Sequence, residues 1–318
     1  MTQEIQQRLN DSKAMRWTAL VLVASMMFFG YMFVDVMSPL QALIEQEKGW
    51  NPESFGTYAA SEYILNVFGF LIIAGFILDK CGIRFTGELS ASMMFIGACI
   101  KFYAVSSAFE GTALATWLDS WWVELPGSAK LASLGFMIFG CGCEMAGTTV
   151  SKILAKWFKG KEMALAMGLE MSIARIGVFA AMFFSPLISE RFVVNGMNSV
   201  VAPFLFSALL LVIGLLNFFV FTIMDTKFDK QLVAIGEATA ETDPEEEFHF
   251  SDLGKIFTSK MFWIIALLCV LYYSAIFPFQ RFATNFLEET IPGMTNAEAA
   301  GLFKWFPILA MILTPFLG

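Results

Sequence analysis

The sequence predicts an all-α membrane protein with several membrane-spanning helices. Of its 318 residues, 57% are hydrophobic and only 15% are charged, whereas soluble domains have roughly 45–50% and about 25%. The apolar residues also gather in runs of about 20, the length at which an α-helix crosses the ~30 Å hydrocarbon core of a bilayer. Together the composition and the length of the runs exclude an ordinary soluble domain.

Eight apolar runs follow one another along the chain, and each is a candidate span. They cover residues 17–44, 55–79, 84–105, 131–154, 163–188, 201–224, 261–287 and 297–318. The first run is too long for the core of a cleavable signal and has no small-residue cleavage site, so we expect it to remain as a helix.

The positive charges predict a cytoplasmic N-terminus. With that orientation, thirteen Lys and Arg residues lie in the inner segments, and only Lys48, Lys130 and Arg191 lie in the outer ones. Inner loops of membrane proteins carry such an excess. We therefore expect a multi-pass integral membrane protein, and a bacterial cytoplasmic membrane as its location.

A polar stretch divides the chain after the sixth span. It contains three consecutive glutamates, Glu245 to Glu247, and is expected to be a cytoplasmic linker, in which the segment SDLGKIF could form a short helix on the membrane face. The predicted division is a cytoplasmic N-terminus (1–16), a six-helix bundle (17–224), the linker (225–260) and the incomplete start of a second bundle (261–318). Two bundles joined by a linker are typical of transporters built from repeats.

The segment GFILDKCGIR, residues 75–84, lies between the second and third spans. Gly75 and Gly82 allow close helix approach and a tight reversal. Asp79, at the membrane edge, can accept hydrogen bonds from the N-terminus of a neighbouring helix, and Arg84 holds the loop on the cytoplasmic side. An ordinary tight inner loop is the alternative interpretation.

In this position the segment resembles the loop signature of the major facilitator superfamily. The resemblance implies two six-helix bundles around a central cavity, working by alternating access. This chain would then hold the N-terminal bundle and the first one or two helices of the C-terminal bundle, as a C-terminally truncated fragment.

Four further segments resemble the branch of that superfamily that contains the lysosomal dipeptide transporter. They are DVMSPLQ (35–41), GCGCE (140–144), KWFKGKEMALAMGLEMSIARIG (156–177) and CVLYYSAIFPF (269–279). One position differs from the pattern of that branch. Residue 136 is Phe136, where members of the branch commonly have an arginine. Any coupling role of that arginine is therefore in doubt here.

Two charges lie near the middle of apolar spans. At 1.5 Å per residue, Glu144 lies about 16 Å and Arg175 about 18 Å from the inner ends of the fourth and fifth spans, which we expect to be antiparallel neighbours. A charge at this depth faces a water-filled cavity or a partner. A carboxylate suits an ammonium and a guanidinium suits a carboxylate, so the two predict a zwitterion site, and the resemblance implies the same roles. A structural ion pair that only locks two helices is the alternative.

Weaker candidates lie nearer the outer ends of the spans. Asp35 and Arg281 are hypothesised to form an outer gate between the first and seventh spans. Glu62 and Lys304 are expected to be wetted by outer water. Four further polar side chains are predicted to line the cavity: Asn66, Tyr272, Tyr273 and Gln280.

We therefore expect a secondary active or facilitative carrier of small zwitterionic solutes, most simply di- or short peptides. Alternatives are a carrier of another organic anion and a membrane scaffold or sensor that transports nothing. The sequence shows no nucleophile–histidine constellation, phosphate loop or metal cluster, so no enzyme activity, cofactor or nucleic-acid partner is expected. Proton coupling through Glu144 or Asp35 stays open. The expected partners are a small-molecule substrate and the lipid bilayer, with a monomeric chain.

Overall fold

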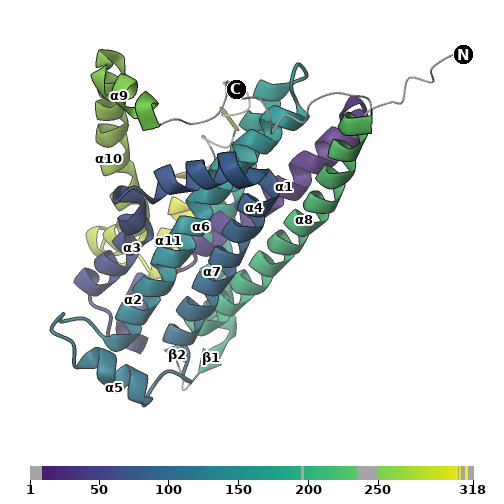
Figure 1. Cartoon of the computed structure of the whole chain (residues 1–318). Helices are drawn as coiled ribbons and strands as arrows, with labels where there is room; N and C mark the ends of the chain where they lie inside the picture. The colour runs from purple at the N-terminus through teal and green to yellow at the C-terminus, as the bar shows by residue number, and fades with distance from the viewer. Residues whose placement is uncertain (1–8, 195–196, 235–249, 307, 309–311, 314–318) are drawn as a thin grey trace, which may run out of the picture.

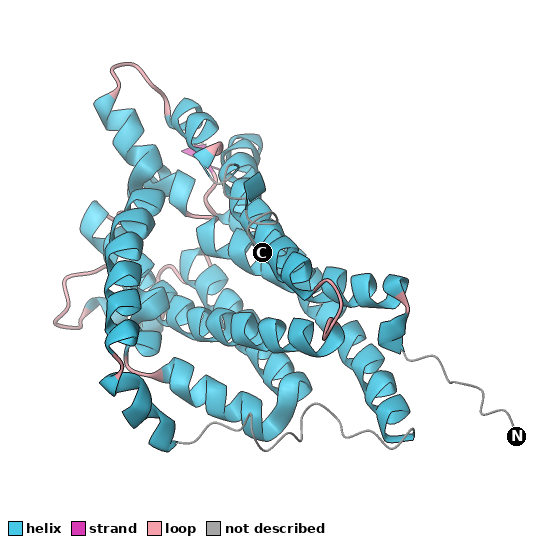
Figure 2. Ribbon diagram, turned by 90° about the horizontal axis from the view of Figure 1, so that it is seen from above, coloured by secondary structure: helices cyan, strands magenta, loops and turns pink. Residues whose placement is uncertain are grey.

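The computed structural model describes residues 9–194, 197–234, 250–306, 308 and 312–313 (Figure 1). Within them, five helices are long and apolar enough to cross a membrane, or up to six if the bent pair of α3 and α4 counts as one span. Figure 2 shows that helices make up nearly all of the described chain, with one short β-hairpin. The predicted all-α membrane fold is confirmed.

The elements follow in chain order. They are η1 (Leu9–Asp11), α1 (Lys13–Asp35), η2 (Ser38–Leu40), α2 (Gln41–Lys48), α3 (Pro52–Val67), α4 (Phe70–Val105), α5 (Ala113–Asp119), α6 (Gly127–Trp157), α7 (Met163–Arg191), β1 (Val193–Val194), β2 (Met197–Asn198), α8 (Val201–Ala234), α9 (Phe250–Thr258), α10 (Lys260–Thr290) and α11 (Asn296–Phe303). We call the end of the bundle that carries α5 the α5 end, and the opposite end, where α8 finishes, the linker end (Figure 1).

Helix α1 forms the centre of the bundle and packs against α6, α7 and α8. Small residues permit this close approach. A Cβ added at Gly177 of α7 would collide with the backbone oxygen of Phe28, and one at Gly214 of α8 would lie 3.1 Å from the Cα of Met26. In a bilayer, where apolar surface gains little by leaving lipid, such close packing drives helix association.

Helices α4 and α6 also pack closely. A Cβ at Gly97 would lie 2.5 Å from the carbonyl oxygen of Gly135, and one at Gly135 would lie 2.9 Å from that of Gly97. The two glycines therefore fix the distance between these helices. A Cβ at Gly140, further along α6, would meet the backbone oxygen of Glu62, so α3 approaches the same helix as closely.

The expected second span is bent rather than straight. Helix α3 ends at Val67, and α4 leaves it at an angle of 53°. Gly69 has a φ of 98°, a left-handed conformation that costs glycine little, and it allows this bend. A second left-handed glycine, Gly82 with a φ of 78°, interrupts α4 between the expected second and third spans.

The prediction of eight spans therefore exceeds what the described residues contain. The expected eighth span is represented there by α11, which has eight residues, and most of the run beyond it lies outside the described residues. The sixth span is longer than expected, because α8 continues ten residues past 224 into the expected linker. The anticipated short helix before the seventh span is α9.

The expected second bundle begins with α10, which stands to one side of the helices that precede it, here called the first bundle (Figure 1). It contacts η2, α2, α9 and α11, while α11 also packs on α7. Side chains of the lower part of α10 in this view, towards the α5 end, therefore meet residues of the first bundle.

Candidate functional site

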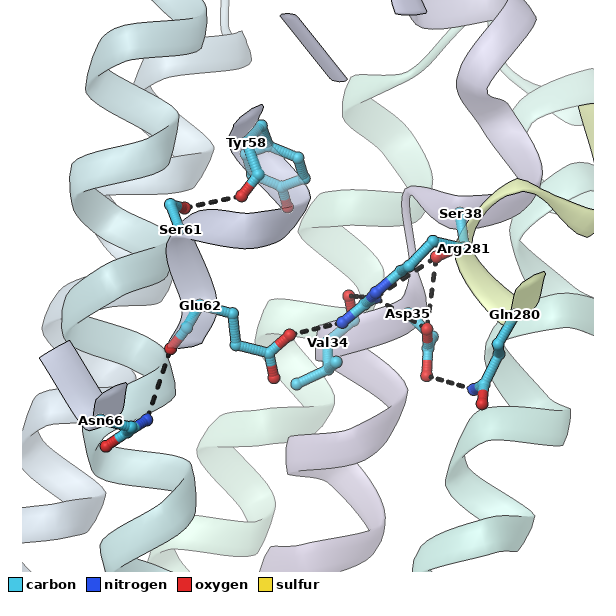
Figure 3. A network of polar contacts seen from close by, with 9 residues as sticks. All are labelled: Val34, Asp35, Ser38, Tyr58, Ser61, Glu62, Asn66, Gln280 and Arg281. Carbon is cyan, nitrogen blue, oxygen red and sulfur yellow. Dashed lines mark hydrogen bonds and ion pairs between the residues drawn. The ribbon is translucent and has the colours of Figure 1, made fainter. Parts of the chain in front are cut away.

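Arg281 of α10 inserts its guanidinium into the first bundle near the α5 end. Its Nη1 lies 2.8 Å from Oδ1 of Asp35 and donates to the carbonyl oxygen of Val34 at 3.0 Å. Its Nη2 donates to Oε2 of Glu62 (Figure 3). One arginine thus bridges α1 and α3 of the first bundle to α10.

Asp35 is the last residue of α1 and has several hydrogen-bond partners. Its Oδ1 also accepts from the hydroxyl of Ser38 at 3.2 Å, and its Oδ2 accepts from Nε2 of Gln280 at 3.3 Å. Asp35, Glu62 and Arg281 are all less than a tenth exposed. Buried charges persist only when they are paired and hydrogen-bonded. We call these five residues the gate cluster: Asp35, Ser38, Glu62, Gln280 and Arg281.

The predicted contact of Asp35 with Arg281 is confirmed, while their role as a gate stays a prediction. The expectation that water wets Glu62 is wrong, because its side chain is buried and paired with Arg281. The sequence did not predict this contact, because 219 positions separate the two residues along the chain. Asn66, one turn beyond Glu62 on α3, donates to the backbone oxygen of Glu62 at 3.5 Å.

Glu144 and Arg175 are each half-buried. No hydrogen bond or ion pair joins these two side chains, both of which belong to the described residues. Helix α7 packs mainly on α1 and makes fewer contacts with α6, so the fourth and fifth spans are neighbours, as expected, but α1 is the main partner of α7. Tyr31 of α1 interacts electrostatically with both charges. The three side chains therefore come from three helices, and α1, which carries Tyr31, contacts both α6 and α7.

The remaining predicted cavity residues divide into buried and exposed ones. Gln280 is buried in the gate cluster and Asn66 is half-buried. Tyr272 and Tyr273 are 59% and 45% exposed, so the described residues do not enclose them. Tyr273 stacks on Phe277 with ring centroids 4.9 Å apart. The cavity-lining role of the two tyrosines stays a prediction.

The motif at 75–84 lies at the linker end. Asp79 accepts from the ammonium of Lys152 on α6 at 2.7 Å, a partner the sequence did not predict. Gly82 breaks the helical conformation of α4 at the position of the expected turn, while a full reversal of the chain there stays a prediction. Gly75 does not mark a close helix approach, since no described atom lies within 4 Å of a Cβ built there.

Arg84 of the motif belongs to a charge cluster with α6 and α8. Its Nη1 lies 2.9 Å from Asp229 and 3.4 Å from Asp225. The ammonium of Lys156 lies 2.7 Å from Asp229 and 3.0 Å from Asp225, which also accepts from the indole of Trp157 at 2.9 Å. We call Arg84, Lys156, Asp225 and Asp229 the linker-end cluster. Our sequence analysis placed both aspartates in a solvated linker, but α8 carries them into contact with α6.

Lys101 of α4 is another residue that the sequence analysis missed. It is 0% exposed, and its ammonium lies 3.6 Å from the centroid of the Phe136 ring. Phe136 is the position at which the resembled branch commonly has arginine. A basic side chain is therefore present beside this position, supplied by a different helix.

Comparison with known proteins identifies the family. A model of the major facilitator superfamily matches residues 20–318. The chain is 26% identical over 313 residues to the lysosomal dipeptide transporter MFSD1 of Danio rerio, covering 95% of this chain and 61% of that protein. It is 23% identical over 318 residues to the MFSD1 protein of Homo sapiens, covering 96% of this chain and 61% of that protein.

A third relative of the same name, from Bos taurus, is 24% identical over 318 residues, with 96% of this chain and 60% of that protein covered. The chain thus spans about three fifths of the length of the curated relatives it matches. Together with the all-helical fold and the membrane-spanning helices, the family match shows an integral multi-pass membrane protein of a transporter family rather than an enzyme. The chain belongs to the major facilitator superfamily.

Proposed function

We propose that the protein carries small zwitterionic solutes, most simply dipeptides, across a membrane by alternating access. The observation that carries this proposal is the pair of half-buried, opposite charges, Glu144 and Arg175, without an ion pair between them. Leaving two such charges unpaired inside a membrane protein is costly unless water or a ligand meets them. A zwitterion would satisfy both at once.

The roles of the two side chains follow from their chemistry. The guanidinium of Arg175 presents a planar pair of donors for a carboxylate, and the carboxylate of Glu144 accepts from an ammonium. Tyr31 lies within electrostatic reach of both and has a hydroxyl to offer the peptide backbone. The printed name of the relatives, a dipeptide transporter, supports the same substrate class.

The gate cluster supports alternating access. It ties α10 of the second bundle to α1 and α3 of the first at the α5 end. If the N-terminus is cytoplasmic, as the positive charges predict, the α5 end would face outward, and the gate cluster would be an outer gate in its closed state. Opening would separate Arg281 from both carboxylates. Because Asp35 is already held in this cluster, Glu144 is the better candidate for proton coupling.

The membrane in which the protein lies and its oligomeric state are separate parts of the proposal. The relatives are named as lysosomal proteins, which does not support the expectation of a bacterial membrane. We propose that the protein acts as a monomer. A carrier of another organic anion remains the second candidate, favoured by the half-buried guanidinium of Arg175, which would bind a carboxylate whether or not the solute also carried an ammonium.

The test uses the full-length protein reconstituted in liposomes. We would measure dipeptide-induced thermal stabilisation and dipeptide counterflow for the wild type, Glu144→Gln and Arg175→Lys, with Glu124→Gln in the exposed loop as the matched control. The zwitterion site predicts that both site variants lose binding and the control does not. Unchanged binding in both variants, or no dipeptide binding by the wild type, contradicts the proposal.

A further inference from the structure

A ring contact between Tyr63 of α3 and Phe277 of α10 joins the two bundles. The ring centroids lie 5.7 Å apart and the ring planes are inclined by 32°, a separation typical of favourable aromatic pairs. Both side chains are half-buried. The transport cycle proposed above gives neither residue a role.

The ring pair lies on the inner side of the gate cluster. Helix α10 runs towards the α5 end, and Phe277 precedes Arg281 on it by four residues (Figure 1). Four residues make about one helical turn, or about 6 Å of depth. On α3, Tyr63 directly follows Glu62, the second carboxylate that Arg281 contacts. The two rings therefore meet about one turn deeper in the protein than the guanidinium.

Tyr63 is also close to the proposed solute site. Its hydroxyl interacts electrostatically with Glu144, as well as with Glu62 and Arg281 of the gate cluster. The packing of α3 on α6 explains this proximity, because a Cβ added at Gly140, one turn before Glu144, would meet the backbone oxygen of Glu62. The ring pair therefore lies on the side of the gate cluster that faces the solute site.

Helix α10 continues this aromatic surface one turn deeper. The ring of Tyr273 stacks on that of Phe277, with centroids 4.9 Å apart and planes 10° from parallel. Tyr273, Phe277 and Arg281 follow one another at intervals of four residues, so they share one face of the helix. This face of α10 presents two rings and, beyond them, the guanidinium of the gate cluster.

The two charges of the proposed site do not distinguish one dipeptide from another. Glu144 and Arg175 would bind an ammonium and a carboxylate, which every dipeptide carries. Discrimination among solutes requires contacts with the part that differs, the side chains. Aromatic rings provide large apolar faces for such contacts, and a tyrosine hydroxyl can also donate or accept a hydrogen bond. The ring pair has the chemistry and the position for this role.

We propose that Tyr63 and Phe277 form the outer wall of the solute site and select for solutes that carry an apolar or aromatic side chain. The wall is complete only while α10 lies against the first bundle, because the two rings belong to different bundles. The inference rests on the proposed function, since it needs a solute bound beside Glu144 and Arg175.

The test compares two dipeptides that differ in one side chain. We would measure the affinity of the full-length protein for glycylglycine and for glycylphenylalanine, by thermal shift and by inhibition of counterflow. The wild type should bind glycylphenylalanine about fivefold more tightly, the effect of one favourable aromatic contact. Tyr63→Ala and Phe277→Ala should lose this preference and keep their affinity for glycylglycine.

Two further variants separate a contact with the solute from a structural role. Tyr63→Phe keeps the ring and should keep the preference. Tyr103→Ala is the matched control and should keep it as well, because Tyr103 makes a ring contact of the same centroid distance, 5.7 Å, with Phe109 in the loop before α5. An unchanged preference in both Tyr63→Ala and Phe277→Ala, an equal loss of affinity for both peptides, or a wild type without the preference would overturn the inference.

If an alanine variant is not recovered in folded form, the leucine variant at the same position replaces it. Leucine keeps an apolar side chain without a ring, so the same loss of preference is expected. If the wild type binds no dipeptide, the proposed substrate is wrong, and the comparison is made with acetate and phenylacetate, two carboxylates that differ by a ring. A preference for phenylacetate that Tyr63→Ala abolishes would support the outer wall, and its absence would overturn the inference too.

Discussion

Nη1 of Arg281 lies 2.8 Å from Oδ1 of Asp35, although 246 positions separate the two residues in the chain. The same guanidinium reaches Glu62, so a single side chain of α10 joins two helices of the first bundle. Since all three charges are buried, we expect their pairing to contribute strongly to holding α10 against the first bundle at the α5 end.

Replacing Arg281 with methionine should strongly destabilise the contact of α10 with α1 and α3 at the α5 end. It would leave two buried carboxylates without their cation, and breaking a buried pair from one side costs about 3–5 kcal/mol. We expect a clearly lower melting temperature in detergent, or an α5 end that opens to water-soluble thiol reagents. Arg191→Met, an exposed arginine at the end of α7, is the control and should change neither. A variant as stable and as closed as the wild type would show that the pairing contributes little.

The close contact of α1 and α7 predicts a large effect of a small change. Gly177→Ala would drive a methyl group into the backbone oxygen of Phe28, and overpacking of this kind costs about 1–3 kcal/mol. Gly75→Ala provides a matched control, since its new methyl group would meet no described atom. Thermal unfolding of both variants in the same detergent checks the prediction, and equal melting temperatures would argue against close packing at Gly177.

Two lysines one turn apart on α6 should differ in their effect on stability. The side chain of Lys156 is 4% exposed and lies between two aspartates, whereas that of Lys152 is 30% exposed and pairs with Asp79 alone. Lys156→Met should therefore cost about 3–5 kcal/mol of unfolding free energy, and Lys152→Met about 1 kcal/mol or less. Denaturant unfolding of the two variants gives the comparison. A larger loss for Lys152→Met would mean that the linker-end cluster does not stabilise α8 against α6.

A zwitterion site predicts how substrate modification affects affinity. Acetylation of a dipeptide's N-terminus removes the ammonium that Glu144 is proposed to bind. Charge-assisted hydrogen bonds contribute about 1.5–3 kcal/mol each, so affinity should fall about tenfold or more in the wild type. Glu144→Gln should bind the two peptides about equally. Titration by thermal shift measures both proteins, and equal affinities in the wild type would remove Glu144 from the site.

The local sequence pattern determined most of the long helices of this protein and the superfamily to which it belongs. Runs of about 20 apolar residues predicted most of the long helices, and the glycine at position 82 predicted an interruption that α4 has there. The superfamily followed from the motif at 75–84. The contact between Asp35 and Arg281 was predictable because both charges lie near the outer ends of their apolar runs, in the expected first and seventh spans.

Only the tertiary structure decided which residues meet across long sequence distances. It buried Glu62 against Arg281, enclosed Lys101 in aromatic rings and placed α1 against both α6 and α7. Hydropathy and periodicity describe one helix at a time and report how deep a side chain lies along its own helix. They do not report which neighbour it faces, because that depends on where small residues let helices approach closely. Packing among helices therefore determined whether each ionisable side chain became an ion-pair partner, was enclosed by aromatic rings or stayed half-buried.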